Sequence, residues 1–298
     1  MASNNDSIWV YNPSFPLAVV GCVIYSLLFV ATTYTTWVKH RAWFFSAVVV
    51  GAAVEVAGYA CRVYSAKNQA VLDQISLQIP YILTLTLTVL APVFIAAGNY
   101  QLISRLILCV LAPARHRILG IPGRLLTPIF VSLDIASFVV QGNGSAVASA
   151  GSWTGPREKI GRYMLIGGLL LQLLAFGLFL AVLGRFHFLA RRLAVPDAPA
   201  GWRKVVCAVY ISSIAIMIRC VYRVCEFTEG MQGYAFRNEW LFWVFEALPM
   251  AVAIGAFCVW HPSQHLPRSA LLSKKAGARK QLGTEMATST STSHERMV

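Results

Sequence analysis

The sequence predicts an all-α polytopic membrane protein: a bundle of seven transmembrane helices with the N-terminus outside the cytosol and the C-terminus in it. Three observations lead to this prediction. Of the 298 residues, 57% are hydrophobic and only 12% are charged, whereas soluble domains carry about 25% charged residues. Seven apolar runs are long enough to cross a bilayer. Lysine and arginine gather in alternate connections between these runs.

Each predicted span is one apolar run close to the length of about 20 residues that a helix needs to cross the hydrocarbon. Several runs begin or end at Trp or Tyr, which favour the membrane–water interface. The third run contains Pro92, which has no N–H to donate and is predicted to kink its helix. The fourth run is the shortest. In chain order the predicted spans are Pro16–Trp37, Trp43–Tyr64, Leu77–Ile103, Leu125–Gln141, Gly161–Leu183, Val205–Cys225 and Trp240–Trp260.

Basic residues decide the predicted orientation. One set of connections, with the C-terminal tail, holds 17 Lys and Arg residues, and the opposite side holds 6. The other two, Arg219 and Arg223, lie inside the sixth run. Because cytosolic loops are enriched in Lys and Arg, the side with 17 is predicted to be cytosolic. This orientation also explains the net charge of +13, so we expect no nucleic-acid partner.

Two tails flank the predicted transmembrane domain, which covers residues 16–260. Residues 1–15 form a polar exterior tail with no basic region ahead of the first apolar run, so that run is predicted to act as both signal and anchor. Asn5 begins a glycosylation triplet in this tail. Residues 261–298 are basic and then rich in Ser and Thr, without apolar periodicity. We expect this second tail to be disordered and cytosolic.

Ten polar or ionisable side chains fall in the outer half of the predicted bundle, where such groups are costly and mark candidate functional sites. Most form pairs seven residues apart, which is two turns along one helix face. Counting about 1.5 Å of rise per residue, we expect them to line one vestibule open to the exterior. The candidate ligand-binding residues are Glu55, Arg62, Asp134, Gln141, Gln172, Arg219, Arg223, Glu226, Glu239 and Glu246.

Two interpretations of this polar set remain open. Carboxylates and arginines can pair across helices only to hold a bundle together, and Arg219 and Arg223 facing Glu55, Asp134 or Glu246 would do so. Alternatively, the set forms a path or a pocket for a polar ligand or an ion. The large number of charges on one side of the bundle favours the second interpretation.

Several chemistries are excluded or disfavoured. All six histidines lie on the predicted cytosolic side or at its edge, away from the intramembrane carboxylates, so we expect no metal site. No lysine lies within a span, which excludes a Schiff base to a retinal-type cofactor. Neither a phosphate-binding G-x-x-x-x-G-K-[ST] loop nor a G-x-S-x-G nucleophile motif occurs. We therefore expect no cofactor and no enzyme activity.

The polar residues and their neighbours also carry a family resemblance. The pattern consists of Tyr11-Asn12-Pro13-Ser14, Glu55-Val56-Ala57-Gly58-Tyr59-Ala60-Cys61-Arg62, Leu90-Ala91-Pro92, Tyr100, Asp134, Gln141-Gly142-Asn143-Gly144, Gly167-Gly168-Leu169 with Gln172, Arg219-Cys220-Val221-Tyr222-Arg223-Val224-Cys225-Glu226, and Glu239-Trp240 with Phe245-Glu246-Ala247-Leu248-Pro249-Met250. In this order it resembles the fungal lipid-translocating exporter family, which includes aminocholesterol-resistance and sphingoid long-chain-base-resistance proteins. Glu246 stands where the family usually has Asp.

The resemblance implies a seven-span fungal protein of the plasma membrane that exports or senses amphiphilic lipids and contributes to lipid and drug tolerance. Our first hypothesis is translocation of amphiphilic lipids such as sphingoid bases, sterol-like molecules or cationic amphiphiles. The alternative is a seven-span receptor that binds a lipid in the exterior pocket and signals to a cytosolic partner. Both make membrane lipids and an amphiphilic lipid ligand the expected partners.

Overall fold

The computed structural model describes residues 14–68, 74–111, 117–118, 120–150, 155–192, 201–230 and 233–265. Within them, seven helical stretches are long and apolar enough to cross a membrane. The predicted fold class is thereby confirmed, and the chain is an integral membrane protein. The direction in which it crosses the bilayer stays a prediction.

The spans are built mainly from six long helices, and shorter helices complete the first, second and seventh spans. The long helices are α1 (Phe15–Thr33), α2 (Ser46–Lys67), α3 (Gln74–Val110), α4 (Gly123–Ala150), α5 (Gly155–Arg192) and α6 (Trp202–Glu229). The short ones are α7 (Tyr234–Arg237), α8 (Glu239–Phe242), α9 (Leu248–Val259), α10 (Pro262–His265) and the 3₁₀ turn Trp43–Phe45. A short hairpin of two strands with two residues each, β1 (Arg117–Ile118) and β2 (Ile121–Pro122), lies between α3 and α4.

Two spans contain a π-helical turn. One, Tyr34–Lys39, extends α1, and the other, Trp243–Ala247, joins α8 to α9. A π-turn holds one more residue than an α-turn, and such turns occur often at functional sites. The second π-turn carries Glu246, one of the candidate ligand-binding residues.

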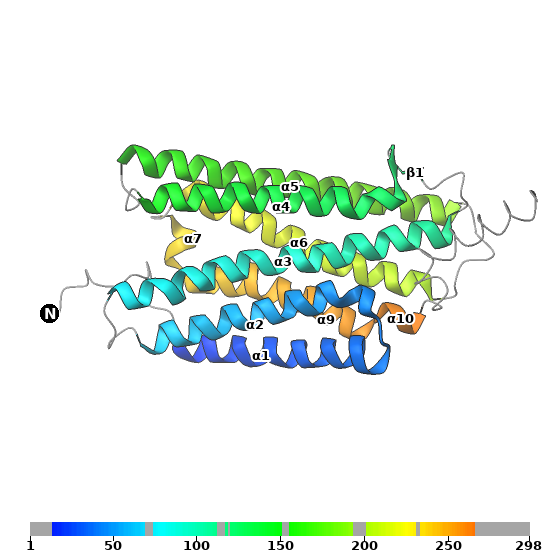
Figure 1. Cartoon of the computed structure of the whole chain (residues 1–298), viewed down its shortest axis with the longest axis horizontal. Helices are drawn as coiled ribbons and strands as arrows, with labels where there is room; N and C mark the ends of the chain where they lie inside the picture. The colour runs from blue at the N-terminus through cyan, green and yellow to red at the C-terminus, as the bar shows by residue number, and fades with distance from the viewer. Residues whose placement is uncertain are drawn as a thin grey trace, which may run out of the picture.

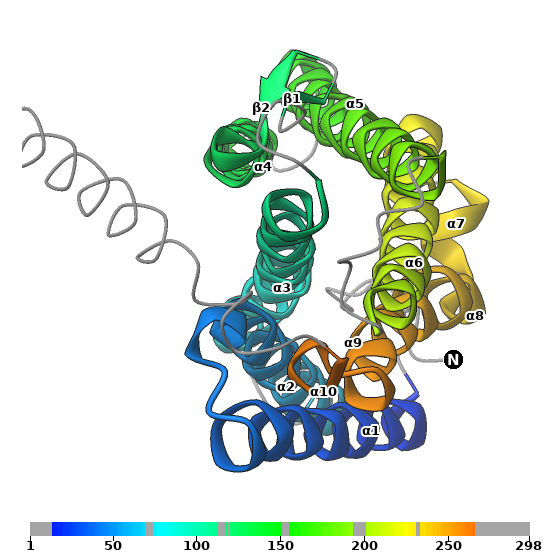
Figure 2. The ribbon, with the colours of Figure 1, turned by 90° about the vertical axis from the view of Figure 1, so that its right-hand side faces the viewer.

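Consecutive spans run in opposite directions along one elongated bundle (Figure 1). Viewed along the bundle, α3 lies between α2 and α4, and α6 lies between α5 and α9 (Figure 2). The start of α5 and the helix α7 lie at one end of the bundle, whereas the hairpin and α10 lie at the other (Figure 1). The first end is the predicted exterior side.

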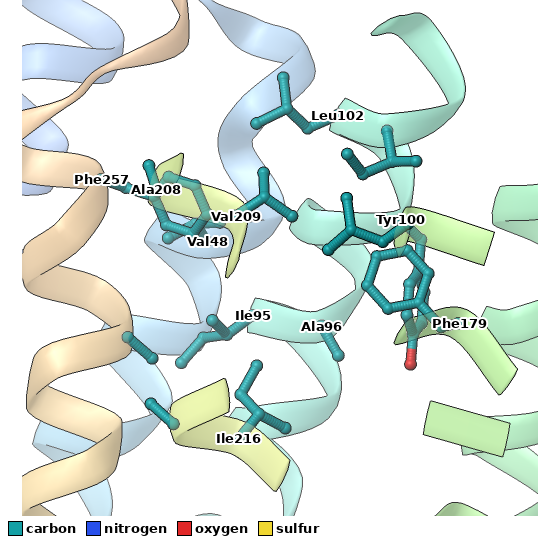
Figure 3. Packing of buried hydrophobic residues seen from close by; sticks show 14 of the residues in the cluster. Val48, Ile95, Ala96, Tyr100, Leu102, Phe179, Ala208, Val209, Ile216 and Phe257 are labelled. Carbon is teal, nitrogen blue, oxygen red and sulfur yellow. The ribbon is translucent and has the colours of Figure 1, made fainter. Parts of the chain in front are cut away.

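Helix α6 lies deepest in the bundle. In its most apolar stretch, 61% of the residues are buried, against 22% in the first span. Side chains from α2, α3, α5, α6 and α9 pack against one another in the core, among them Val48, Ile95, Phe179, Val209 and Phe257 (Figure 3). The outward faces of the spans are apolar and exposed, as lipid contact requires.

Every predicted span is present, but most helices are longer than the apolar runs. The fifth span shows the largest difference, because α5 runs from Gly155 to Arg192 whereas the prediction ran from Gly161 to Leu183, and α4 continues to Ala150 whereas the prediction ended at Gln141. Apolar periodicity measures the hydrocarbon-crossing part of a helix and misses polar turns that continue beyond it. The predicted tails lie mostly outside the described residues, which leave out 1–13 and 266–298. Of the C-terminal tail, residues 262–265 form α10 rather than a disordered segment, and His261 before them is buried.

Candidate functional site

Two arginines and two glutamates form an ion network between α6 and the seventh span. Arg219 and Arg223 lie one turn apart on α6, and both donate to Oε1 of Glu246. The Arg219 Nη2 to Glu246 Oε1 distance is 3.1 Å. Arg223 also donates from Nη1 to Glu226 Oε2 at 3.0 Å. All four side chains are buried, so each charge depends on its protein partners for stabilisation.

A proline inside α3 supplies this network with a further acceptor. Pro92 lies inside α3 and has no N–H, so the carbonyl of Thr88, four residues earlier, loses its helical donor. Arg219 Nη2 donates to that carbonyl oxygen at 2.6 Å. The proline thus leaves a free carbonyl acceptor inside the bundle, and the Arg219 guanidinium group donates to it. This hydrogen bond connects the ion network to α3.

Glu55 of α2 lies beside this network. The face of α2 that carries it is packed against α3: a Cβ on Gly51 would lie 3.2 Å from the Ala91 carbonyl oxygen, and one on Gly58 would lie 3.3 Å from the Thr88 side chain. Glu55 follows Gly51 by four residues and precedes Gly58 by three, which places it on the same helix face. Its charge interacts with those of the α6 arginines and of Glu246.

A second ion pair lies toward the predicted exterior end. Arg62 of α2 donates from Nη2 to Glu239 Oε1 at 3.1 Å. Glu239 also accepts from the backbone N–H of Ser14 at 2.9 Å and from the indole of Trp243 at 3.3 Å. The Arg62 guanidinium lies 4.2 Å from the ring centre of Phe242, within the range of a cation–π interaction. This pair joins the start of α1 to α2 and α8.

Asp134 and the two glutamines belong to a different part of the bundle, between α3, α4 and α5. The hydroxyl of Tyr100 donates to Asp134 Oδ2 at 2.8 Å, and the Tyr100 ring packs among Phe residues of α4 and α5. Gln141 of α4 donates to Gln172 of α5 at 3.0 Å. Both glutamines and Asp134 are buried.

The structure therefore divides the ten predicted residues into three groups instead of one vestibule. The first group is the ion network with Glu55 beside it. The second is the Arg62–Glu239 pair, which lies nearer the predicted exterior end. The third is the Asp134 group, which lies on the other side of α3. Of the pairings considered from sequence, Arg219 and Arg223 with Glu246 are present. Asp134 forms no ion pair among the residues that the structure describes, because the hydroxyl of Tyr100 serves it instead.

Sequence reasoning missed several residues that complete these groups. The Thr88 carbonyl was overlooked, although a proline four residues later is a signal for a free acceptor. Tyr25 donates to the carbonyl of Ala247 at 2.6 Å and so fastens α1 to the π-turn. Asn99 of α3 donates to Ser212 of α6 at 3.1 Å. No periodicity distinguishes these residues from ordinary core positions.

The described residues contain no group of three or more His, Cys, Asp or Glu side chains that could hold a metal ion. The paired carboxylates already have arginine, hydroxyl, indole or backbone N–H donors as partners. Chemically, the arrangement suits recognition of charged and hydrogen-bonding groups.

Comparisons with known proteins give a consistent result. A family model described as RTA1 like protein matches residues 48–269. Among curated proteins of Saccharomyces cerevisiae, the chain is 29% identical to Protein RTA1 over 72% of this chain and 64% of that protein. It is 31% identical to Protoporphyrin uptake protein 1 over 70% of this chain and 65% of that protein. It is 25% identical to Sphingoid long-chain base transporter RSB1 over 88% of this chain and 75% of that protein.

The matched part thus covers just under two thirds of the length of the first two relatives. No solved structure matches the chain. The family model covers most of the described bundle, from α2 to the last helix, and includes all ten candidate residues. The chain therefore belongs to the RTA1-like family of membrane proteins.

Proposed function

We propose that this protein moves or exports amphiphilic lipids, such as sphingoid bases and other cationic or sterol-like amphiphiles, across the membrane and so contributes to lipid and drug tolerance. One observation carries the proposal: an ion network built from α6 and the seventh span, with α2 and α3 at its side, lies inside a bundle with apolar outer faces. An amphiphile needs polar partners for its head and apolar surface for its chain, and this arrangement offers both.

The arginines fit this role because they offset the negative charge of the carboxylates. A buried carboxylate without a cationic neighbour is strongly disfavoured. With Arg219 and Arg223 beside it, Glu246 has cationic partners inside the bundle and can interact with the ammonium or hydroxyl groups of a lipid head. Truncating one partner would strand a charge, so the network links ligand recognition to the packing of the helices.

The relatives support the same class of substrate. The names of two of them refer to uptake of protoporphyrin and to transport of a sphingoid long-chain base. Both cargoes are amphiphilic, with a large apolar part and charged or polar groups. We extend to this chain only what they share, which is movement of an amphiphile, and we propose the plasma membrane as its location.

Reconstitution tests the proposal. Purified full-length protein in liposomes should accelerate the movement of a fluorescent sphinganine from one leaflet to the other, measured by quenching of the outer leaflet with a membrane-impermeant reagent. Protein-free liposomes and heat-inactivated protein are the controls. Rates equal to those of the controls would contradict the proposal.

The same experiment separates the receptor alternative, in which the protein binds a lipid and signals to a cytosolic partner. A receptor would bind the probe, measured by fluorescence polarisation in detergent, without accelerating its movement between leaflets. The translocator proposal requires both binding and movement.

A further inference from the structure

Glu55 differs from every other acidic residue of the central bundle. It is 2% exposed, and among the residues that the structure describes no side chain or backbone group forms a hydrogen bond or an ion pair with it. Glu226, Glu239 and Glu246 each accept from arginine, and Asp134 accepts from tyrosine. A buried carboxyl group without a donor is expensive, so its position needs an explanation.

None of the described donors around Glu55 forms a hydrogen bond with it, although Nε of Arg219 and Nε of Arg223 are buried without an acceptor. On α6, Arg219 and Arg223 both donate to Glu246. On α3, the hydroxyl of Thr88 donates to carbonyls of its own helix, and residues 87–95 contain no titratable side chain. On α1, Tyr25 donates to the carbonyl of Ala247. Among the described residues, the surrounding protein therefore gives this carboxyl group no direct hydrogen bond or ion pair.

Other titratable groups near Glu55 are Tyr59 on its own helix and Glu246 in the π-turn, and Arg62 lies close to Tyr59. Tyr59 is buried and stacks on Tyr25, with ring centres 4.5 Å apart. Arg62 is paired with Glu239. Glu246 is a second carboxylate, and its Oε2 atom is buried without a hydrogen-bond donor.

Counting charges gives a simple result. The network and Glu55 together contain two guanidinium groups and three carboxyl groups. The Arg62–Glu239 pair adds one group of each sign and so leaves the net charge unchanged. Fully ionised, the region holds one negative charge too many. Because charge in a region of low dielectric must be balanced, one additional monovalent cation would make this region neutral.

We propose that Glu55 is the exchange site for one proton and the ammonium head of the transported lipid. Without lipid, the proton is bonded to a carboxyl oxygen of Glu55. When the ammonium arrives, the O–H bond breaks, the proton leaves to water, and the carboxylate forms an ion pair with the ammonium. One positive charge replaces another, and no covalent bond to the lipid forms. Lipid movement is thereby coupled to a counterflow of protons. This inference rests on the function proposed above.

The test uses a probe that cannot carry a proton itself. Full-length protein is reconstituted in liposomes that contain a pH-sensitive dye, and fluorescent N,N,N-trimethyl-sphinganine is added outside. We expect one proton to leave the lumen for each probe molecule that enters the inner leaflet, so the lumen becomes alkaline at a rate that matches probe movement. Protein-free liposomes report passive leakage.

Glu55→Gln keeps the shape of the side chain but removes the carboxyl group, so the variant can bind neither the proton nor the ammonium as a counter-ion. Its rate of probe movement and its proton flux should both fall by about tenfold or more, because the charged partner of a desolvated ammonium is lost. Glu55→Asp should retain measurable coupling. Glu158→Gln is the matched control, since Glu158 lies on the first turns of α5 outside the three groups, and it should behave as wild type. Size-exclusion profiles verify that the variants are folded.

The outcomes are distinguishable. Probe movement by the wild-type protein without a matching proton flux would overturn this inference and leave the proposed function intact, and this result needs no variant. A folded Glu55→Gln protein with wild-type flux would also overturn it. Absence of probe movement in the wild-type protein would contradict the proposed function itself, and the exchange site with it.

Discussion

Arg219 illustrates how single residues hold this bundle together. Its guanidinium group donates both to a carboxylate of the seventh span and to the backbone carbonyl that Pro92 leaves free in α3. One side chain therefore connects three spans. Removing it would leave a carbonyl with no donor and Glu246 with one arginine fewer, and both defects lie in the buried interior.

We expect Arg219→Ala to destabilise the protein by about 3–5 kcal/mol, the usual cost of breaking a buried ion pair by removing one partner. The measurement is thermal unfolding of the purified protein in detergent, together with its abundance in the membrane. Lys67→Ala is the control, because Lys67 is exposed in the last turn of α2. Equal melting temperatures for the two variants would show that Arg219 has no essential partner.

The Tyr100–Asp134 hydrogen bond predicts smaller losses of stability that are coupled between the two residues. Tyr100→Phe removes the only hydrogen-bond donor that the described residues offer to Asp134, and we expect a loss of about 1–3 kcal/mol. Asp134→Asn keeps an acceptor for the tyrosine hydroxyl and should cost less. In a double-mutant cycle the two changes should be non-additive. Additive losses would mean that the two side chains act independently.

At the scale of helices, small residues control how closely α4 and α5 approach. A Cβ on Gly168 would lie 2.7 Å from Gln141 Cγ and 3.0 Å from the Ser137 carbonyl oxygen. At Gly167, one residue earlier, a Cβ would meet nothing within 4 Å. Both glycines belong to the Gly167-Gly168-Leu169 part of the family pattern, but only Gly168 faces the partner helix.

This difference gives a matched pair of variants. Gly168→Ala should separate α4 from α5, because the obstructing atoms include backbone, and it should weaken the Gln141–Gln172 bond. We expect a lower melting temperature for it. Gly167→Ala should be neutral or stabilising by up to about 1 kcal/mol, the difference in helix propensity between the two residues. Similar effects of both substitutions would contradict the assigned α4–α5 contact.

The seven spans could be predicted from sequence because apolar length and basic loops are properties of single segments. The grouping of the polar side chains could not, because it depends on which helices are neighbours. Spacing of seven residues places Asp134 and Gln141 on one face of α4 but does not show that this face meets Tyr100 and Gln172 rather than α6. The pairing of Arg219 with Glu246 was within reach, since opposite charges in apolar surroundings must find each other.

For the whole molecule, the main expectation from the sequence concerns its direction in the membrane. Lys and Arg number 17 on one side and 6 on the other, and the structure places α10 and the hairpin together at the end of the bundle that receives the larger number (Figure 1). We predict that this end is cytosolic and that Asn5 is exterior.

Epitope tags at the two termini test this orientation. On intact cells, antibody should reach only the N-terminal tag, and permeabilisation should expose the C-terminal one. An odd number of spans requires the two tags to differ. Labelling of both tags or of neither tag on intact cells would contradict a count of seven, and labelling of the C-terminal tag alone would reverse the orientation.

The π-helical turn at Trp243–Ala247 acts as a one-residue insertion in the seventh span. Deleting the exposed residue Val244 would let the segment close into regular α-helix, and the parts on either side would then rotate relative to each other by about 100°, the angle that one residue subtends in an α-helix. Glu239 and Glu246 lie on opposite sides of that position. The inserted residue therefore sets the angle between the two side chains around the helix axis. It lets the seventh span bind Arg62 at its outer end and the α6 arginines about two turns deeper.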